Sequence, residues 1–329
     1  MSKIAKLASL ALACPLFIGA QSASPAGSAA RFPAGTPVQM IVTIGHHYGF
    51  TPPTLTRDDL TVRQGYESLV VTNLIPLQGE RAGLDLFLLV DNCSNCEPGS
   101  KFEELSHFIT SQPAATAVGV AYIQDGKLTV AQNPTTDHQR AVQALSVPTM
   151  SKPASPFNAL ADLIRGWPQG TSRRAVLMVS NGIDPAATGN TEDASAEAAL
   201  EAAQRASVTV YAIYNPAADY LATDSSKLYS GQVQLAHVAD ETGGEAYFLG
   251  FGPLPSLAPF LADLSDHLAN QYLLELLATP AEGAGELQRI TVKSKIADIE
   301  VMVPDKVWIP GRGAGPAGAI EEGSGEGRP

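Results

Sequence analysis

Buried apolar runs that alternate with amphipathic segments constrain the fold of residues 83–279 more than any other feature. The run "LDLFLLV" at 84–90 is apolar almost throughout, as a strand buried on both faces of a parallel sheet must be. "RAVLMVS" at 174–180 has the same character, and segments with helical spacing lie between such runs. Strands that alternate with helices predict a mostly parallel sheet with helices on both faces. We therefore expect an α/β domain over 83–279.

Two details of this domain follow from local signals. Asp125 and Gly126 lie between the apolar runs "TAVGVAYI" and "KLTVAQ" and predict a hairpin, so we expect the third strand to run antiparallel at an edge of the sheet. The run at 257–276, "LAPFLADLSDHLANQYLLEL", places leucines on one stripe and predicts a long amphipathic helix. His267 lies within it, and we expect an ordinary helix residue there.

Both ends of the chain predict additional β structure. The N-terminal segment at 37–80 contains short apolar runs separated by Pro and Gly, including one predicted strand at 67–77. The C-terminal segment at 286–311 contains "ELQRITVKSK" and "IEVMVPDKVWI", two predicted strands that can pair with the N-terminal segment. These segments predict a small β domain. The Gly-rich end at 312–329 cannot bury a core, so we expect it to be disordered.

The first residues of the chain have the layout of a cleavable signal peptide. Lys3 and Lys6 precede an apolar run that ends in small residues, which predicts a signal peptide over 1–23 and a linker over 24–36. The apolar run is shorter than the ~20 residues that a membrane-spanning helix needs. We therefore expect an exported protein, periplasmic or secreted, with no transmembrane segment in the mature chain. Lipidation at Cys14, which ends "ALAC", is a minor alternative.

Composition excludes several function classes. The formal net charge of −12 over 329 residues, without a cluster of Lys and Arg, argues against a nucleic-acid partner. The sequence has no G-x-S-x-G, no Gly-rich phosphate loop after a strand and no H-E-x-x-H. We therefore expect no nucleic-acid partner and no enzymatic activity.

Polar residues follow two of the predicted strands. Asp91 ends the first strand and Asn181 ends the strand at 174–180, and parallel sheets place ligands at the carboxyl ends of their strands. Asn95 and Ser155 can reach the same edge. These four oxygen donors are candidate ligands of Mg²⁺ or Ca²⁺, which prefer oxygen.

A second interpretation needs no metal ion. Asp91, Ser94 and Asn95 can cap the helix that follows, while Asn181 and Asp184 can shape the turn in "SNGIDP". Both interpretations of these residues stay open at this point.

The sequence resembles the von Willebrand factor A (vWA) domain over about residues 36–311. The resemblance lies in the order of strands and helices, in "LFLLVDNCSN" and "VLMVSNGID", and, outside the core, in "LTRDDLTVRQG" and "ITVKSKIADIEVMVPDKVWI". The flanking segments are similar to those of exported vWA-related proteins of acidobacteria. The resemblance implies a vWA-like sheet of Rossmann type and a protein-binding or adhesion module with a metal-ion-dependent adhesion site.

The adhesion site departs from the family pattern D-x-S-x-S with a later Thr and Asp. Asp91 matches the first Asp, but Cys93, Asn95 and Asn181 stand in place of the two Ser and the later Asp. The Thr position falls at Ala154 or Ser155. The resemblance therefore implies a degenerate site, and a Mg²⁺ or Ca²⁺ ion held by Asp91, Asn95, Ser155 and Asn181 would be bound weakly.

Cys93 and Cys96 form a C-x-x-C pair after a strand. In an oxidising compartment this spacing favours a structural disulfide, with free thiols as an alternative. A strand followed by C-x-x-C and a helix is also the arrangement of thiol-disulfide oxidoreductases. Three hypotheses about function therefore stand: a binding module, an oxidoreductase that uses Cys93 and Cys96, and a scaffold whose adhesion site has decayed.

Overall fold

The structure is a computed structural model, and it describes residues 35–46, 53–91, 100–124, 127–145, 154–168, 170, 172–185, 194–216, 225–251 and 255–312. Several predictions concern residues outside these ranges: the signal peptide at 1–23, the linker at 24–36 except its last two residues, the tail at 312–329 except Arg312, and the side chains of Cys14, Cys93, Asn95 and Cys96.

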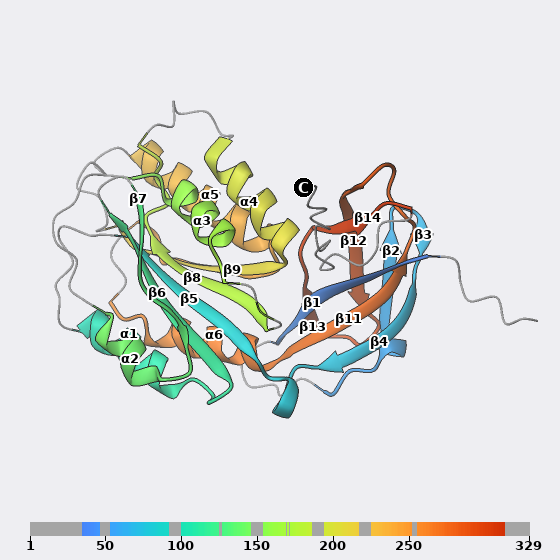
Figure 1. Ribbon diagram of the computed structural model, residues 1–329, viewed down its shortest axis with the longest axis horizontal. Coiled ribbons are helices and arrows are strands. Elements are labelled where there is room, and N and C mark those ends of the chain that lie inside the picture. The colour runs from blue at the N-terminus through green and yellow to red at the C-terminus, as the bar shows by residue number, and fades with distance from the viewer. Residues whose placement is uncertain are drawn as a thin grey trace, which may run out of the picture. The chain divides into compact units, whose positions relative to one another are not determined.

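A six-stranded sheet forms the centre of the α/β part (Figure 1). Its strands, in chain order, are β5 (Leu84–Asp91), β6 (Thr116–Gln124), β7 (Lys127–Thr135), β8 (Arg173–Ser180), β9 (Val208–Tyr214) and β10 (Ala246–Tyr247). The spatial order is β10-β9-β8-β5-β6-β7. All neighbours are parallel except β6 and β7, so β7 is the antiparallel edge strand that the hairpin signal predicted.

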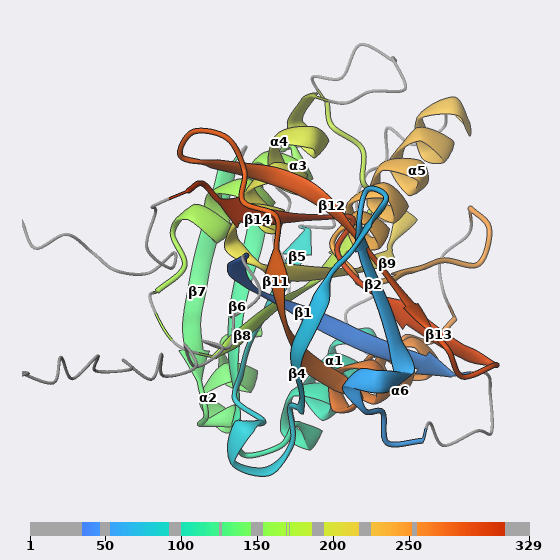
Figure 2. The same cartoon turned by 90° about the vertical axis from the view of Figure 1, so that its right-hand side faces the viewer.

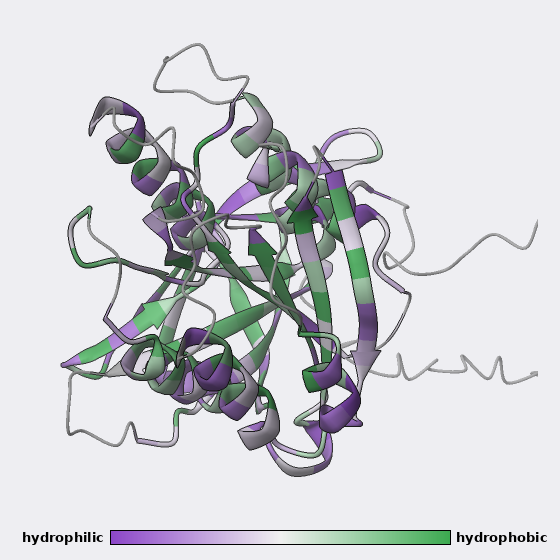
Figure 3. Ribbon diagram, turned by 90° about the vertical axis from the view of Figure 1, so that its left-hand side faces the viewer, coloured by the Kyte–Doolittle hydropathy of each residue, from purple (hydrophilic) through white to green (hydrophobic). Residues whose placement is uncertain are grey.

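Helices cover both faces of this sheet, as the fold-class prediction required (Figure 1). The helices are α1 (Ser100–Ser111), α2 (His138–Gln143), α3 (Pro156–Arg165), α4 (Ala194–Ala206), α5 (Ser225–Glu241) and α6 (Ala258–Ala269). Phe87 and Leu89 of β5 share a buried cluster with α3, α4 and α5, whereas Leu86 and Leu88 share another with α1, α2 and α6. This burial on both faces is why β5 reads as a continuous apolar run. Figure 3 shows the hydrophobic strands between helices that carry hydrophilic residues.

The ends of the chain form two four-stranded antiparallel sheets with a shared apolar core (Figure 2). One sheet has the order β13-β1-β11-β4, with strands β1 (Thr36–His46), β4 (Val70–Pro76), β11 (Gln271–Ala278) and β13 (Ile299–Met302). The other has the order β14-β12-β2-β3, with strands β2 (Leu60–Gln64), β3 (Glu67–Ser68), β12 (Gly285–Ser294) and β14 (Lys306–Pro310). Short 3₁₀ turns at Arg57–Asp59 and Gly79–Arg81 complete the described elements.

The helix predicted over 257–276 is wrong beyond Ala269. Residues Gln271–Ala278 form β11, which pairs with β1 on one side and β4 on the other. The apolar residues of "QYLLELLA" fit the spacing of an amphipathic helix and also the alternation of a strand. The segment forms a strand because it pairs with a strand on each side. The change comes at Asn270, the C-cap of α6.

Two predicted single strands are each divided between the two sheets. The run at 67–77 contains β3 and β4, and the run at 299–309 contains β13 and β14. In the second run Pro304 has no N–H to continue a ladder, so the chain leaves one sheet there and enters the other.

Buried polar side chains join the β strands to the α/β part. The Arg173 guanidinium, at the start of β8, donates hydrogen bonds to the carbonyl oxygens of Leu77 and Leu268 at 3.1 Å each. Burial lowers the pKa of Arg173 to about 10, so the group stays charged at neutral pH. Gln271 Nε2 donates to the hydroxyls of Thr43 and Tyr211. These contacts fix the end of α6 against the amino ends of the central strands.

Candidate functional site

The central strands β5 and β8 meet at the point where the strand order reverses. From β5 the chain proceeds to β6 on one side, whereas β8 and β9 lie on the other side. Loops that leave two adjacent parallel strands in opposite directions open a crevice at the carboxyl edge, where ligands of such sheets bind. Asp91 is the last residue of β5 and Asn181 follows the last residue of β8. The structure therefore brings Asp91 and Asn181 to adjacent strand ends.

Asp91 is buried and held by a neighbouring strand. Its Oδ2 accepts a hydrogen bond from Ser180 Oγ at 2.7 Å, and that same Oγ accepts one from the Gly182 N–H at 3.1 Å. Ser180 is fully buried at the end of β8. The Asp91 carboxylate thus fixes the turn that begins at Asn181.

Asn181 begins a tight turn against helix α5. Its Oδ1 accepts a hydrogen bond from the Ile183 N–H at 2.8 Å, and Gly182 adopts a positive φ of 69°. A Cβ on Gly182 would lie 2.3 Å from the carbonyl oxygen of Gly231 in α5, so only glycine permits this approach. The backbone after β8 is therefore fixed by close packing on α5.

Ser155 lies in a second chain of hydrogen bonds. As the N-cap of α3 its Oγ accepts from the Asn158 N–H at 3.3 Å, and it donates to Ser195 Oγ at 3.3 Å. Ser195, in the first turn of α4, donates in turn to Asp184 Oδ2 at 2.7 Å. Ser155 is thereby linked to the turn that carries Asn181.

The oxygens of this edge differ in part from those that the sequence predicted. Asp91, Ser155 and Asn181 lie in the loops and strand ends of the carboxyl edge, while Asn95 lies outside the described residues. The buried carboxylate of Asp184 was predicted only as a turn residue, and its partner Ser195 was not predicted. Asn181 does shape a turn, as the interpretation without a metal ion predicted, and Ser155 caps a helix. Metal binding by these residues stays a prediction.

Exposed apolar side chains flank this edge, and we call them the apolar rim. They come from α5 and from the segment after β10, and their exposed fractions are Tyr229 63%, Val233 40%, Phe248 40%, Leu249 63% and Phe251 46%. Gln232 Nε2 donates to the Gly250 carbonyl oxygen at 2.6 Å, which holds the two segments together. The adjacent Gly231 packs on Gly182. The rim therefore lies on α5, the helix that packs on the turn of Asn181, and on the segment after β10, and the sequence analysis did not find it.

The oxygens at this edge fit a hard divalent cation only weakly. Hydroxyl and amide oxygens each have two lone pairs. The described hydrogen bonds to Ser155 Oγ and Asn181 Oδ1 each use one of them, so both oxygens retain capacity for a cation. The Asp91 carboxylate is the charged group of the predicted set. A single carboxylate compensates little for the dehydration of Mg²⁺ or Ca²⁺.

The strand order β10-β9-β8-β5-β6-β7, with the antiparallel edge strand β7 and helices on both faces, matches the vWA-like fold of Rossmann type that the sequence resemblance implied. The chain adds to it the small β domain built from both of its ends. The exported acidobacterial type within this fold stays a prediction.

No protein-family model matches the chain, and no curated protein matches it. Among solved structures, BatB from Bacteroides thetaiotaomicron is similar at 17% identity, over 57% of this chain and 97% of that chain, with a TM-score of 0.39. The ArnB paralog VWA2 from Sulfolobus acidocaldarius is similar at 9% identity, over 84% of this chain and 76% of that chain, with a TM-score of 0.39. Proximal thread matrix protein 1 from the mussel byssus, with a zinc-occupied MIDAS motif, is similar at 13% identity, over 58% of this chain and 46% of that chain, with a TM-score of 0.41.

Within the described residues, none of the helices has the length and apolar character needed to cross a membrane.

Proposed function

We propose that the chain is an exported vWA-type protein-binding module, and not an enzyme, whose contact surface is the carboxyl edge of the six-stranded sheet. The observation that carries this proposal is the group of exposed apolar side chains on α5 and on the segment after β10, because α5 also packs on the turn of Asn181. Exposed apolar side chains that gather beside polar groups are typical of protein interaction sites. Aromatic residues, which the rim contains, are enriched in such interfaces.

The polar groups beside the rim would set the orientation of the partner. Asp91, Ser155 and Asn181 form a degenerate metal-ion-dependent adhesion site that binds Mg²⁺ or Ca²⁺ weakly. A partner that supplies a carboxylate would complete the ligand set, so metal and partner would each strengthen the binding of the other. The expected partner is therefore a protein with an apolar patch next to an acidic side chain.

The described hydrogen bonds at this edge also favour a binding role. Ser155 Oγ accepts from a backbone N–H and donates to the Ser195 hydroxyl, as in a helix cap. Ser195 in turn donates to the Asp184 carboxylate in the turn after β8. A serine nucleophile is instead usually activated by an adjacent base such as histidine. Export is supported by the charged, apolar and small-residue start of the sequence. Mass spectrometry of the cellular protein should show a mature N-terminus between Gln21 and Ser24, whereas an intact Met1 would refute export by this signal.

Capture of partners by variants of the rim tests the proposal. The immobilised protein is exposed to the extracytoplasmic fraction of its source organism with Mg²⁺ or with EDTA, and captured proteins are identified by mass spectrometry. Leu249→Asp places a charge in the rim, whereas Val130→Asp alters a comparably apolar side chain, 42% exposed, on the edge strand β7. We expect one partner that wild type and Val130→Asp retain and Leu249→Asp loses, with weaker capture in EDTA.

Other outcomes would support the competing hypotheses. Equal capture by all three proteins would contradict a contact surface at the rim, and Mg²⁺ without effect on capture would favour a decayed site. An insulin-reduction assay with turnover that Cys93→Ser abolishes would favour the oxidoreductase. We expect no such turnover, and a disulfide between Cys93 and Cys96.

A further inference from the structure

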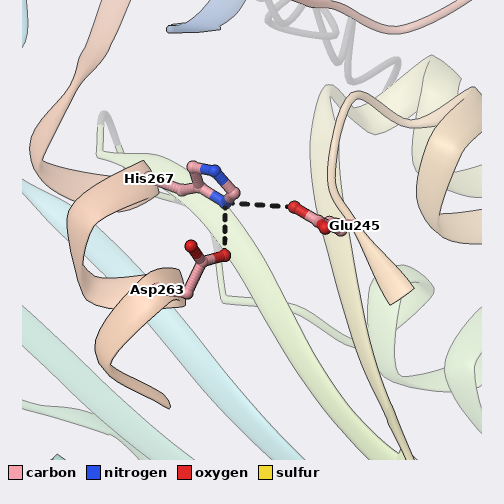
Figure 4. Close-up of side chains that lie close together, drawn as sticks. All are labelled: Glu245, Asp263 and His267. Atoms are coloured by element: carbon pink, nitrogen blue, oxygen red, sulfur yellow. Dashed lines mark ion pairs between the residues drawn. The ribbon is translucent and has the colours of Figure 1, made fainter. Parts of the chain in front are cut away.

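Three side chains with metal-ligating atoms meet beside the amino end of β10, an edge strand of the six-stranded sheet, and we call this place the amino edge (Figure 4). Asp263 and His267 come from α6, where a spacing of four residues places both on one face of the helix. Glu245 comes from the turn directly before β10. The ligating atoms of all three residues lie within 4.8 Å of one another.

The spacing of these atoms matches the ligands of a tetrahedral metal ion. His267 Nδ1 lies 3.5 Å from Asp263 Oδ2 and 3.6 Å from Glu245 Oε2. Both distances exceed the 2.7–3.2 Å of an ordinary N–H···O hydrogen bond. The hydrogen-bond partner of Nδ1 that the structure shows is the Tyr247 hydroxyl at 3.3 Å, which a metal ion would replace. Ligands at about 2.0–2.2 Å from a tetrahedral zinc ion lie roughly 3.3–3.6 Å from one another. An ion at the centre could therefore bind all three atoms with little movement of the side chains.

Neighbouring aromatic residues hold the histidine and one carboxylate in place. The ring of Tyr211 stacks on that of His267, with centroids 6.4 Å apart and planes inclined by 21°. Tyr247 OH donates to Asp263 Oδ2 at 2.9 Å. Partners behind the ligands that fix their orientation are typical of protein metal sites. His267 is buried, while the side chains of Glu245 and Asp263 are 42% and 38% exposed, so an ion can enter from solvent.

The charges around the cluster favour a cation. The neighbours with the largest electrostatic effect on Glu245 are Asp263, Glu300 and Asp240, and all of them are acidic. Two of these residues lie on other elements, since Asp240 is in α5 and Glu300 is in β13. A bound divalent ion would offset the repulsion among these carboxylates.

We propose that Glu245, Asp263 and His267 form a binding site for a divalent transition-metal ion of the Zn²⁺ type, separate from the adhesion site at the carboxyl edge. The imidazole nitrogen selects this class of ion over Mg²⁺ and Ca²⁺, which prefer oxygen ligands. Three protein ligands leave a fourth tetrahedral position for water or for a donor from another molecule. Because two ligands come from α6 and one from the turn before β10, the ion would tie α6 to the edge strand of the six-stranded sheet.

Calorimetric titration of the purified protein with ZnCl₂ near neutral pH tests this proposal. A Cys93→Ser, Cys96→Ser background removes the thiols as competing zinc ligands. We expect one zinc ion per chain, and a loss of affinity of about tenfold or more in His267→Gln and in Glu245→Gln. The matched control is His237→Gln, because His237 Nε2 also lies 2.8 Å from a carboxylate, that of Glu197, on the surface. This control should bind zinc like the parent protein.

Loss of the buried His267 side chain can disturb folding. The Glu245→Gln variant then still tests the site, because Glu245 is partly exposed. Circular dichroism verifies the fold of each variant. Replacement of zinc by Co²⁺ adds a spectroscopic signature, since tetrahedral Co²⁺ absorbs strongly in visible light. Zinc binding that is absent, that survives both substitutions or that His237→Gln weakens equally would overturn the proposal. So would a cobalt spectrum without tetrahedral bands.

Discussion

At the carboxyl edge of the six-stranded sheet, the oxygens of Asp91, Ser155 and Asn181 accept hydrogen bonds at 2.7, 3.3 and 2.8 Å from groups of the protein itself. At the amino edge, His267 Nδ1 lies 3.5 and 3.6 Å from the carboxylate oxygens of Asp263 and Glu245. Both sets have hydrogen-bond partners within the fold, since the Tyr247 hydroxyl lies 2.9 Å from Asp263 Oδ2 and 3.3 Å from His267 Nδ1. The second set differs because the ligating atoms of all three residues lie within 4.8 Å of one another.

The comparison separates the adhesion site that the family resemblance implies from the metal site that we propose. The carboxyl edge is where the sequence resemblance places an adhesion site, but the described polar groups there mainly stabilise turns and a helix end. The amino edge has no counterpart in the pattern that revealed the family resemblance, yet its mixture of nitrogen and oxygen donors suits a transition metal better. The following predictions test each side of this comparison.

The largest expected effect concerns the rigid turn at the carboxyl edge. Gly182→Ala would combine a positive φ with a Cβ that clashes with Gly231, so we expect a loss of about 3 kcal/mol or more in the free energy of unfolding. Gly65→Ala is the control, because Gly65 has a φ of 59° but a methyl group added there would meet no atom within 4 Å. Urea denaturation should show a loss of only about 1 kcal/mol for the control. Equal losses would mean that packing on α5 does not hold this turn.

Asp91 should matter for the fold and not only for a metal ion. Asp91→Ala removes the acceptor of the hydrogen bond from the fully buried Ser180 hydroxyl, so we expect a loss of about 1–3 kcal/mol in the free energy of unfolding. Asp91→Asn retains an acceptor oxygen and should lose less, while it removes the charge that binds Mg²⁺. If Asp91→Ala and wild type have the same free energy of unfolding, the hydrogen bond from Ser180 does not stabilise the carboxyl edge.

Asn181→Asp should strengthen the weak cation site. The substitution adds a second carboxylate next to Asp91, so we expect Mg²⁺ affinity to rise by about tenfold, or about 1.4 kcal/mol. Calorimetry with MgCl₂ measures this, and zinc binding at the amino edge should be unchanged. Absence of any Mg²⁺ heat in both wild type and Asn181→Asp, even with excess partner, would make the carboxyl edge a scaffold with a decayed site.

The smallest expected effect is a pH dependence of stability in the metal-free protein. Burial, followed by the charges of Asp263, Glu300 and Asp240, raises the pKa of Glu245 from 4.5 to about 7. The folded state therefore binds the Glu245 proton more tightly than the unfolded state does, so this contribution is full below about pH 4.5 and is lost as the pH rises through about 7. Because the side chain is 42% exposed, solvent screening reduces the effect to about 1 kcal/mol.

Thermal denaturation in EDTA between pH 5 and pH 8, with Glu245→Gln as the comparison, measures this contribution. The other groups that face Glu245, namely Asp263, His267, Tyr247, Asp240 and Glu300, are retained in the variant. We expect a flatter pH profile for Glu245→Gln. Identical profiles for the two proteins would show that the fold does not raise the pKa of Glu245.

Much of the fold followed from the sequence because its signals are local. Strands buried on both faces read as apolar runs, and the hairpin signal in the sequence at Asp125 and Gly126 predicted the antiparallel edge strand. The prediction failed at β11, where "QYLLELLA" suits either a helix or a strand. Pairing with β1 and β4, which are distant in the sequence, resolves that ambiguity only in the folded chain.

The sequence likewise predicted only part of each candidate site. Asp91 and Asn181 could be placed at one edge because both end parallel strands. The link from Ser155 through Ser195 to Asp184 depends on how α3 and α4 begin, and no sequence pattern gave it. At the amino edge, the spacing of Asp263 and His267 on one helix was a readable signal. Glu245 joins them only through the packing of α6 against β10, so His267 was predicted as an ordinary helix residue.

Anomalous diffraction from crystals of the protein grown with ZnCl₂ tests the contrast between the two edges most directly. Data measured on both sides of the zinc absorption edge locate the ion without reference to any assumed ligand. We predict one strong peak within about 2.2 Å of His267 Nδ1, with Glu245 and Asp263 as further ligands, and none beside Asp91 and Asn181. A peak at Asp91 and Asn181, or no peak at His267, would contradict the account.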